Sequence, residues 1–320
     1  MILPYLLRLA VLSLGCFFLI HAAFAIGINM LAPWMLALTQ RRTAGSAARL
    51  LLAARLFPSL AAILLVAGIC VPSYLWLEPE AGVEQVGLAC LTLAFFGAAS
   101  WLIAAQRGLR AMVFSVRYAR HCRQLRFRNT RLCLVPGTSG VFALAGILRP
   151  RLVISPDVLH RLSRQELAAA LRHERAHAAS RDNLKRLLLL LAPDVLPFRV
   201  LGGLRALQNA WICYTERYAD DRAVDGNSRH ALSLASALVR VARLRAAAQM
   251  SPLVTSLVAD TGDLEARVNR LLGPAPRLEN SAQAHPVFLT AAGILFGCLA
   301  GIAAPATWQA AHQLLEHLIR

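Results

Sequence analysis

Two histidines and a glutamate stand together near the middle of the chain as His173-Glu174-Arg175-Ala176-His177. On a helix, residues four apart point to the same side, so the imidazoles of His173 and His177 can hold one metal ion. Glu174 lies beside the first histidine, where its carboxylate can reach a water on that ion without binding the metal itself. Zinc would lower the pKa of this water toward about 7, and Glu174 would accept its proton and pass it to a leaving amine. The pattern therefore predicts zinc as the cofactor and peptide-bond hydrolysis as the reaction.

A catalytic zinc site has three protein ligands and one open position, so one more ligand must come from another element. A second helical stretch offers Glu216 and Asp220, which are also four residues apart. We expect Glu216 to be the third metal ligand and Asp220 to accept a hydrogen bond from a histidine N–H. The alternative is ordinary solvated charge on helix surfaces, with Glu174 paired to Arg172 or Arg175.

The histidine motif requires a helix, and the sequence contains a start signal for one. Ser163 followed by Glu166 fits a capping box, from which a helix should run to about residue 179. Short strands are expected before this helix and further helices after it, so the predicted fold class is α+β, mainly helical with a small β-sheet. The strands are expected at 132–135, 141–144 and 151–155, and the later helices at about 184–191, 203–224 and 231–247.

The composition indicates a membrane protein. Hydrophobic residues make up 57% of the 320 residues and charged residues 16%, which is too apolar for a soluble globule or a disordered chain. A spanning helix needs about 20 apolar residues. Four stretches qualify, and the first is long enough that we expect it to be tilted or broken. The spans are expected at about 4–38, 56–77, 86–105 and 286–308, with a membrane region over 1–106, a catalytic domain over 107–285 and a short tail over 309–320.

The net charge of +17 comes from 34 basic and 17 acidic residues, and its distribution predicts an orientation. Before Asp157 the acidic residues are Glu78, Glu80 and Glu84, all between the second and third expected spans, whereas arginines follow the first and third spans. Arginine and lysine mark the cytoplasmic side, so we expect a cytoplasmic catalytic domain and both termini outside. The arginines at 107–131 are expected to contact anionic membrane lipid, and direct nucleic-acid binding is not expected.

The motifs in combination resemble a known family. Over about residues 45–290 the chain is similar to the membrane zinc peptidases of the BlaR/MecR antirepressor type. The segments that carry the resemblance are Leu148-Arg-Pro-Arg-Leu-Val-Ile-Ser155, the histidine motif, Arg181-Asp182-Asn183-Leu184, Glu216-Arg-Tyr-Ala-Asp-Asp-Arg-Ala-Val224 and Leu264-Glu-Ala-Arg-Val-Asn-Arg-Leu-Leu272.

The resemblance implies a gluzincin domain in a bacterial inner membrane, inserted between the third and fourth spans. Its ligands would be His173, His177 and Glu216, and Glu174 would be the general base. It also makes Arg267 a candidate for stabilising the oxyanion, with an ordinary surface arginine as the alternative. Before the motif helix, such peptidases present an edge strand to an extended peptide; plain hairpin packing is the alternative for the strands at 141–144 and 151–155.

The implied substrate is a protein, either a cytosolic repressor in a signalling pathway or another membrane protein. Relatives that sense β-lactams carry a penicillin-binding domain after the last span, and this sequence ends at Arg320, so direct antibiotic sensing is not expected. The runner-up is a quality-control protease similar to the CAAX-protease and HtpX families. A non-catalytic scaffold is a third alternative, which the presence of all four zinc-site residues disfavours.

Three glycines recur every four residues in the last expected span, at Gly293, Gly297 and Gly301. A stripe of small residues lets a neighbouring helix approach closely. We expect this face to pack against another span of the chain or against a second copy in a homo-oligomer.

The orientation can be tested with reporter fusions. Fusions after residue 130 should behave as cytoplasmic and fusions near Glu80 as exported, because arginine-rich loops stay on the cytoplasmic side. Reporter signals of the opposite sign would overturn both the orientation and a cytosolic substrate.

Overall fold

The computed structural model describes most of the membrane region and the catalytic domain and confirms an α+β fold that is mainly helical. The fourth expected span, with its three glycines, lies outside the described residues, and so do the neighbouring linker and most of the tail. The structure describes residues 4–78, 86–120, 123–127, 130–135, 140–147, 150–194, 202–244, 255–256 and 261–273, together with residues 309 and 313.

Among the described residues, three helices are long and apolar enough to cross a membrane. The first is α1 (Tyr5–Thr39). The second begins as α2 (Ala44–Leu65) and continues through a π-helical turn (Val66–Cys70) into α3 (Val71–Leu77). The third is α4 (Leu88–Arg120). These helices support a membrane protein.

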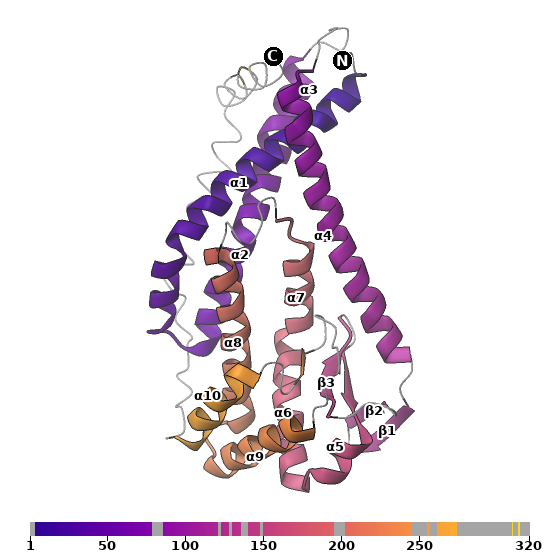
Figure 1. Cartoon of the computed structure of the whole chain (residues 1–320), viewed down its shortest axis with the longest axis vertical. Coiled ribbons are helices and arrows are strands. Elements are labelled where there is room, and N and C mark those ends of the chain that lie inside the picture. Colours follow the sequence, from indigo (N-terminus) through magenta and orange to yellow (C-terminus); the bar gives the residue numbers. More distant parts are fainter. Residues whose placement is uncertain are drawn as a thin grey trace.

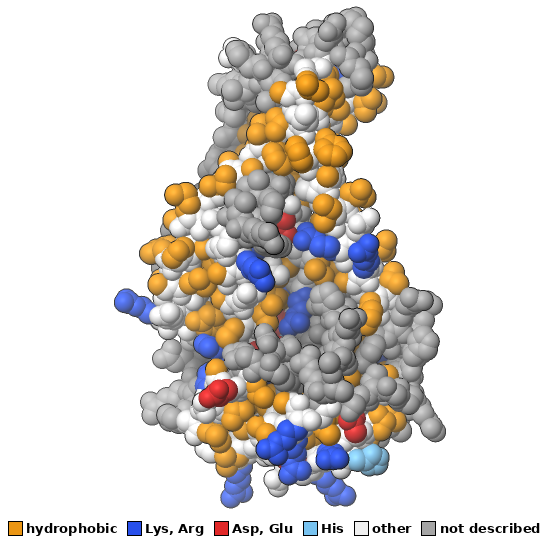
Figure 2. Space-filling model, in the orientation of Figure 1, with side chains coloured by type: hydrophobic (Ala, Val, Ile, Leu, Met, Phe, Trp, Pro, Cys, Tyr) orange, Lys and Arg blue, Asp and Glu red, His pale blue; other side chains and the backbone are white. Residues whose placement is uncertain are grey.

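Large apolar side chains on these helices face outward. They include Met30 and Trp34 of α1, Leu60 of α2, and Phe95 and Leu102 of α4, each more than half exposed. In Figure 2 hydrophobic side chains dominate the upper part of the visible face, whereas arginine and lysine side chains lie in its middle and lower parts. Such an apolar surface is suited to lipid.

The first span is continuous. Helix α1 runs through Pro33 without a break, and in Figure 1 it leans away from α4. Its 35 residues extend about 52 Å, well beyond the roughly 30 Å hydrocarbon core of a bilayer. The broken helix that we allowed for is therefore not what the chain forms.

The second span begins earlier than its hydropathy indicates. Arg49 and Arg55, which precede the expected start of this span at residue 56, lie within α2, and Arg55 is only 2% exposed. A buried arginine can be tolerated in such a helix when a carboxylate neutralises it. Helix α4 likewise continues to Arg120, well past residue 105, where we expected the third span to end.

A five-stranded sheet lies at the far end of the molecule from the N-terminus, in the order β1-β2-β4-β3-β5 (Figure 1). Strands β2 and β4 pair in parallel, and the other pairs are antiparallel. The three expected strands are present, and β1 and β5 were not anticipated. The bounds are β1 Arg123–Phe127, β2 Thr130–Leu134, β3 Phe142–Ala145, β4 Arg151–Ile154 and β5 Thr255–Ser256.

This order removes the expected edge for substrate. Strand β4 lies between β2 and β3, and β3 pairs with β5 through Ala143 and Leu144. The strand-addition hypothesis is therefore wrong for β4. On β3, the main-chain groups of Ala143 and Leu144 face a strand of the same chain.

In the part of the chain that the structure describes, six helices accompany the sheet after α4, and the capping box at the start of the histidine helix is confirmed. The Ser163 hydroxyl accepts from the Glu166 N–H at 3.3 Å, and the Glu166 carboxylate accepts from the Ser163 N–H at 2.7 Å. The bounds are α5 Pro156–Arg161, α6 Arg164–Ser180, α7 Asp182–Leu191, α8 Gly202–Val224, α9 Ser228–Leu244 and α10 Thr261–Leu272.

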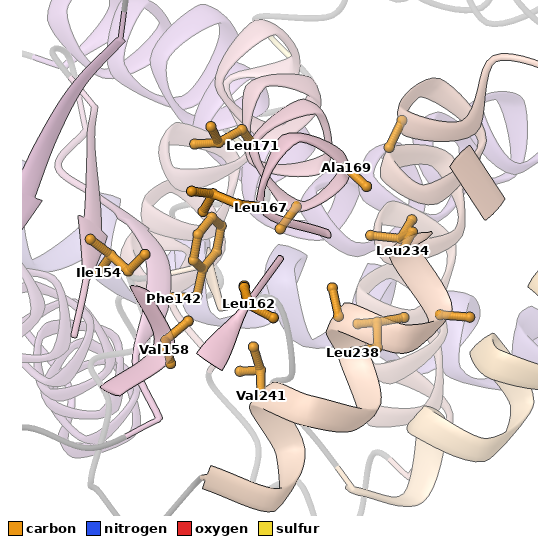
Figure 3. Packing of buried hydrophobic residues seen from close by; sticks show 14 of the residues in the cluster. Phe142, Ile154, Val158, Leu162, Leu167, Ala169, Leu171, Leu234, Leu238 and Val241 are labelled. Atoms are coloured by element: carbon orange, nitrogen blue, oxygen red, sulfur yellow. The ribbon is translucent and has the colours of Figure 1, made fainter. Parts of the chain in front are cut away.

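The main core of the domain lies between the sheet, α6 and α9 (Figure 3). Phe142 and Ile154 contribute from the sheet, Leu167 from α6, and Leu234 and Leu238 from α9, all almost fully buried. This packing fixes α6 at its first turns, so the histidines further along it are held in a defined position.

Helices α7 and α8 join the domain to the membrane region. Helix α8 packs against α1 and α2 on one side and α6 on the other, and α7 packs against α4. Figure 1 shows α7 and α8 between the diverging helices α1 and α4. The helix expected at about 184–191 is therefore present as α7, and it packs against α4.

One carboxylate, that of Asp194, forms ion pairs that connect α2 and α4 to the end of α7. Asp194, just after α7, accepts from Arg55 of α2 and from Arg107 of α4, the latter at 2.9 Å. Arg55 also donates to the side chain of Gln208 on α8 at 3.3 Å, and Arg107 donates to the backbone oxygen of Ala192 at 3.2 Å. Asp194 therefore links two membrane helices to the catalytic domain.

Replacing Asp194 with Asn should destabilise the fold by about 3 kcal/mol, because a buried arginine then loses its carboxylate partner. The measurement is the thermal unfolding midpoint of the full chain in detergent. Glu265→Gln, which removes an exposed carboxylate from α10, is the control and should leave the midpoint unchanged. An Asp194→Asn protein that unfolds at the wild-type temperature would show that the link contributes no stability.

Candidate metal centre

The structure brings His173 and His177 of α6 together with Glu216 of α8. One donor atom from each residue lies within 4.8 Å of the other two, and the three side chains are at most 3% exposed. The Nε2 atoms of the two histidines are 3.1 Å apart, and they lie 3.5 and 3.6 Å from the Glu216 carboxylate oxygens. The alternative of solvated surface charge is therefore wrong for these residues.

The donor set fits zinc. Zinc binds imidazole nitrogen and carboxylate oxygen at about 2.0–2.2 Å, which places the ligand atoms of a tetrahedral site roughly 3.4 Å apart. The three observed separations lie close to that value. In the described part of the chain, both Glu216 oxygens are buried and accept no hydrogen bond, although they lie 3.1 Å from Arg267 and 3.5 Å from Arg186. A carboxylate in such a cationic environment remains charged and can bind a metal ion.

The charges at the cluster also favour a bound metal cation. Against the effect of burial, the Glu216 carboxylate raises the pKa of His177 to about 10. His177 and Arg267 in turn hold the pKa of Glu216 well below its usual range, although burial opposes this. A cation held by both imidazoles would supply the positive charge that Glu216 requires and would leave the imidazoles neutral.

Each histidine is oriented by a carboxylate behind it. The Nδ1 atom of His173 lies 2.9 Å from Asp220 of α8, as the sequence predicts, and Nδ1 of His177 lies 2.8 Å from Asp182 at the start of α7. These contacts point the Nε2 atoms toward Glu216. No role for Asp182 was predicted from the sequence; its position five residues after the second histidine was the available signal.

A break between α6 and α7 brings Asp182 back to the histidine. Arg181 adopts a left-handed conformation with φ of 54°, so the chain turns sharply after α6. Asn183 then donates to the backbone oxygens of Leu144 and Gly146, at 3.1 and 2.7 Å, which fixes the start of α7 against β3. The turn and this anchor place the Asp182 carboxylate behind His177.

Arg267 of α10 is buried, so a surface role for it is wrong. Its guanidinium donates twice to Asp220, at 2.9 and 2.7 Å, and its third nitrogen lies 3.1 Å from Glu216. Against the effect of burial, it lowers the pKa of Asp220 to about 2. In this arrangement Arg267 holds the carboxylates of the cluster in place.

Glu174 lies beside the cluster and is fully buried. In the described part of the chain neither of its carboxylate oxygens has a hydrogen-bond partner, and burial raises its pKa to about 7. A carboxylate with this pKa is suited to accepting and returning a proton near neutral pH. A cavity of about 270 Å³ lies beside His177 and Asp182 and is also lined by Asn183 and by Leu144 of β3.

Such a cluster in a domain packed against helices of spanning length defines a membrane metallopeptidase. Residues 132–290, just under half of the chain, match the family model of Peptidase family M48. This match supports the M48 zinc metallopeptidase family for the domain; it does not reach the narrower BlaR/MecR type. No curated protein matches the chain.

Zinc content should follow the geometry of the cluster. Replacing His173, His177 or Glu216 with alanine should abolish stoichiometric zinc in the purified protein, measured by elemental mass spectrometry, because each removes a ligand. Asp182→Asn should weaken zinc affinity about 10- to 100-fold, because the buried carboxylate orients His177.

Asp221→Asn is the matched control for the zinc measurement. Asp221 is the neighbour of Asp220 and pairs with Arg270 on the outer side of α8, so its loss should not change zinc affinity. Stoichiometric, tightly bound zinc in the Glu216→Ala protein would show that Glu216 is not a ligand.

Proposed function

We propose that this protein is an integral-membrane zinc endopeptidase that cleaves a repressor-like cytosolic regulator as part of a signalling pathway. The observation that carries the proposal is the combination of three converging donor atoms with one buried carboxylate, Glu174, whose oxygens accept no hydrogen bond from the described residues. The resemblance to the BlaR/MecR type supports the choice of a regulator as substrate.

His173, His177 and Glu216 would hold the zinc ion, which when bound polarises a carbonyl group and makes water a better nucleophile. Glu174 accepts the proton of the attacking water and delivers it to the leaving nitrogen of the scissile bond. Burial keeps the pKa of Glu174 at about 7. Among the described residues no ion pair competes for its carboxylate, so it can both accept and release a proton.

The remaining side chains keep this arrangement rigid. Asp220 and Asp182 fix the two imidazoles, and Arg267 keeps Asp220 and Glu216 charged within a buried site. The same resemblance assigns Arg267 a role at the oxyanion; its three contacts with carboxylates favour a positioning role instead.

A membrane protein is the second candidate substrate, and one observation favours it. Helix α8, which carries Glu216, packs directly against α1 and α2. The cluster therefore lies one helix away from the membrane spans, within reach of a segment that emerges from the bilayer. This geometry supports a quality-control protease of the HtpX kind as the alternative function.

Glu174→Gln should keep zinc and lose at least about 100-fold of hydrolysis, because the amide cannot accept the proton while all three ligands remain. The measurement compares the proteomes of cells expressing wild type and Glu174→Gln, with zinc content determined on the purified proteins. Substrates appear as proteins cut in the presence of wild type and intact with the variant.

Glu265→Gln is the control for loss of a carboxylate and should cleave like wild type. A Glu174→Gln protein that cleaves as fast as wild type would rule out the general base and the proposed mechanism. A cut protein that is soluble supports a regulator as substrate, and one that spans the membrane supports the quality-control alternative.

A further inference from the structure

A second cavity lies beside the metal centre, between α2, α6 and α8. Its volume is about 660 Å³, enough for the polar part of a small amphiphile. His173, Glu174 and Glu216 do not line it, so it is separate from the site described above. The walls nevertheless come from the helices that carry those residues.

The cavity is strongly basic. Five cationic side chains and one carboxylate, that of Asp182, line it. The Asp182 carboxylate already lies 2.8 Å from Nδ1 of His177 and 2.8 Å from the amine of Lys185. Among the described residues Arg49, Arg172 and Arg222 pair with no carboxylate. The cationic side chains are Arg49, Arg172, Arg175, Lys185 and Arg222. Arginines gathered in this way favour a ligand that carries a phosphate group.

The other wall is apolar. Ala48 and Leu52 of α2, Ala176 of α6 and Trp211 of α8 line it, and Trp211 is 2% exposed. A site with a cationic rim and an apolar wall matches a ligand that is itself half polar and half apolar. An inorganic ion would leave this wall without a partner.

The position along α2 identifies the source of the phosphate. Arg49, Phe57, Leu60 and Leu64 share the exposed face of this helix, at spacings of eight, three and four residues. Eight residues place Phe57 about 12 Å further along the helix than Arg49, more than the roughly 5–8 Å thickness of one headgroup layer, so Phe57 can lie in the hydrocarbon when Arg49 is at headgroup level. A lipid whose headgroup occupies the cavity could therefore extend its acyl chains along the apolar part of α2.

We propose that this cavity binds the phosphate headgroup of an anionic membrane lipid. Arg49 and Arg222 contact the phosphate at the exposed rim, and Leu52 and Trp211 contact the glycerol and upper acyl region. Because Ala176 precedes His177 and Asp182 orients it, the bound lipid lies one side chain away from the metal centre. The proposal concerns binding and does not depend on catalysis.

The experiment uses delipidated full-length protein in neutral detergent, titrated with phosphatidylglycerol or phosphatidylcholine and read by native mass spectrometry. Wild type should bind phosphatidylglycerol at least about tenfold more tightly than phosphatidylcholine. The double variant Arg49→Gln/Arg222→Gln should weaken phosphatidylglycerol binding about 30-fold. The loss of each arginine near an anionic headgroup should weaken binding a few-fold, and the two effects multiply. Arg229→Gln/Arg243→Gln, which removes two exposed arginines from α9, is the control and should bind like wild type.

A second variant, Leu52→Trp, keeps every charge and fills the apolar wall, and it should also weaken binding; its zinc content reports whether the domain is folded. Equal binding of both lipids by wild type would overturn the proposal without reference to any variant. Unchanged binding by Arg49→Gln/Arg222→Gln would overturn it as well. Displacement of the lipid by millimolar inorganic phosphate would identify a site for free phosphate, and displacement by an acidic peptide would identify a site for protein.

Discussion

The metal centre depends on compensating buried negative charge. Glu216 and Asp220 lie four residues apart on α8 and are almost fully buried, so each must be matched by positive charge at short range. Arg267 from α10 and Arg186 from α7 supply part of it, and His173 and His177 with the ion they can share supply more. Because these partners come from α6, α7 and α10, the three helices must meet α8 at one point, and the core between the sheet, α6 and α9 keeps α6 there.

Helix α7 connects this centre to the membrane region. Asp182 at its start orients His177, and Asp194 just after its end accepts from Arg55 and Arg107. The ten residues of the helix extend about 15 Å, so two buried ionic contacts are joined by one short rigid element. A shift of α2 or α4 relative to the domain would displace Asp194. Because α7 is short and rigid, the displacement would also move Asp182 and the imidazole of His177.

The sequence predicted the local features of the site and missed those that depend on tertiary partners. Spacing of four placed His173 with His177, and Glu216 with Asp220, on single helix faces, and the capping box located the start of α6. Arg55 was placed outside the second span because a hydropathy pattern cannot anticipate that Asp194, far along the chain, neutralises it. Strand β5 was missed because two residues carry no periodicity, and its pairing with β3 could not be inferred.

Helix α8 gives the membrane region and the metal centre a common element. It contacts α1 and α2 on one side and brings Glu216 to the histidines on the other. An ion that binds the folded site and not the unfolded chain stabilises every contact that the folded state requires. The packing of α8 against the spans and the assembly of the metal ligands are therefore thermodynamically linked. A change in the packing of α1 and α2 around α8 would alter metal affinity only where it moves Glu216 relative to the histidines or changes the population of the folded protein.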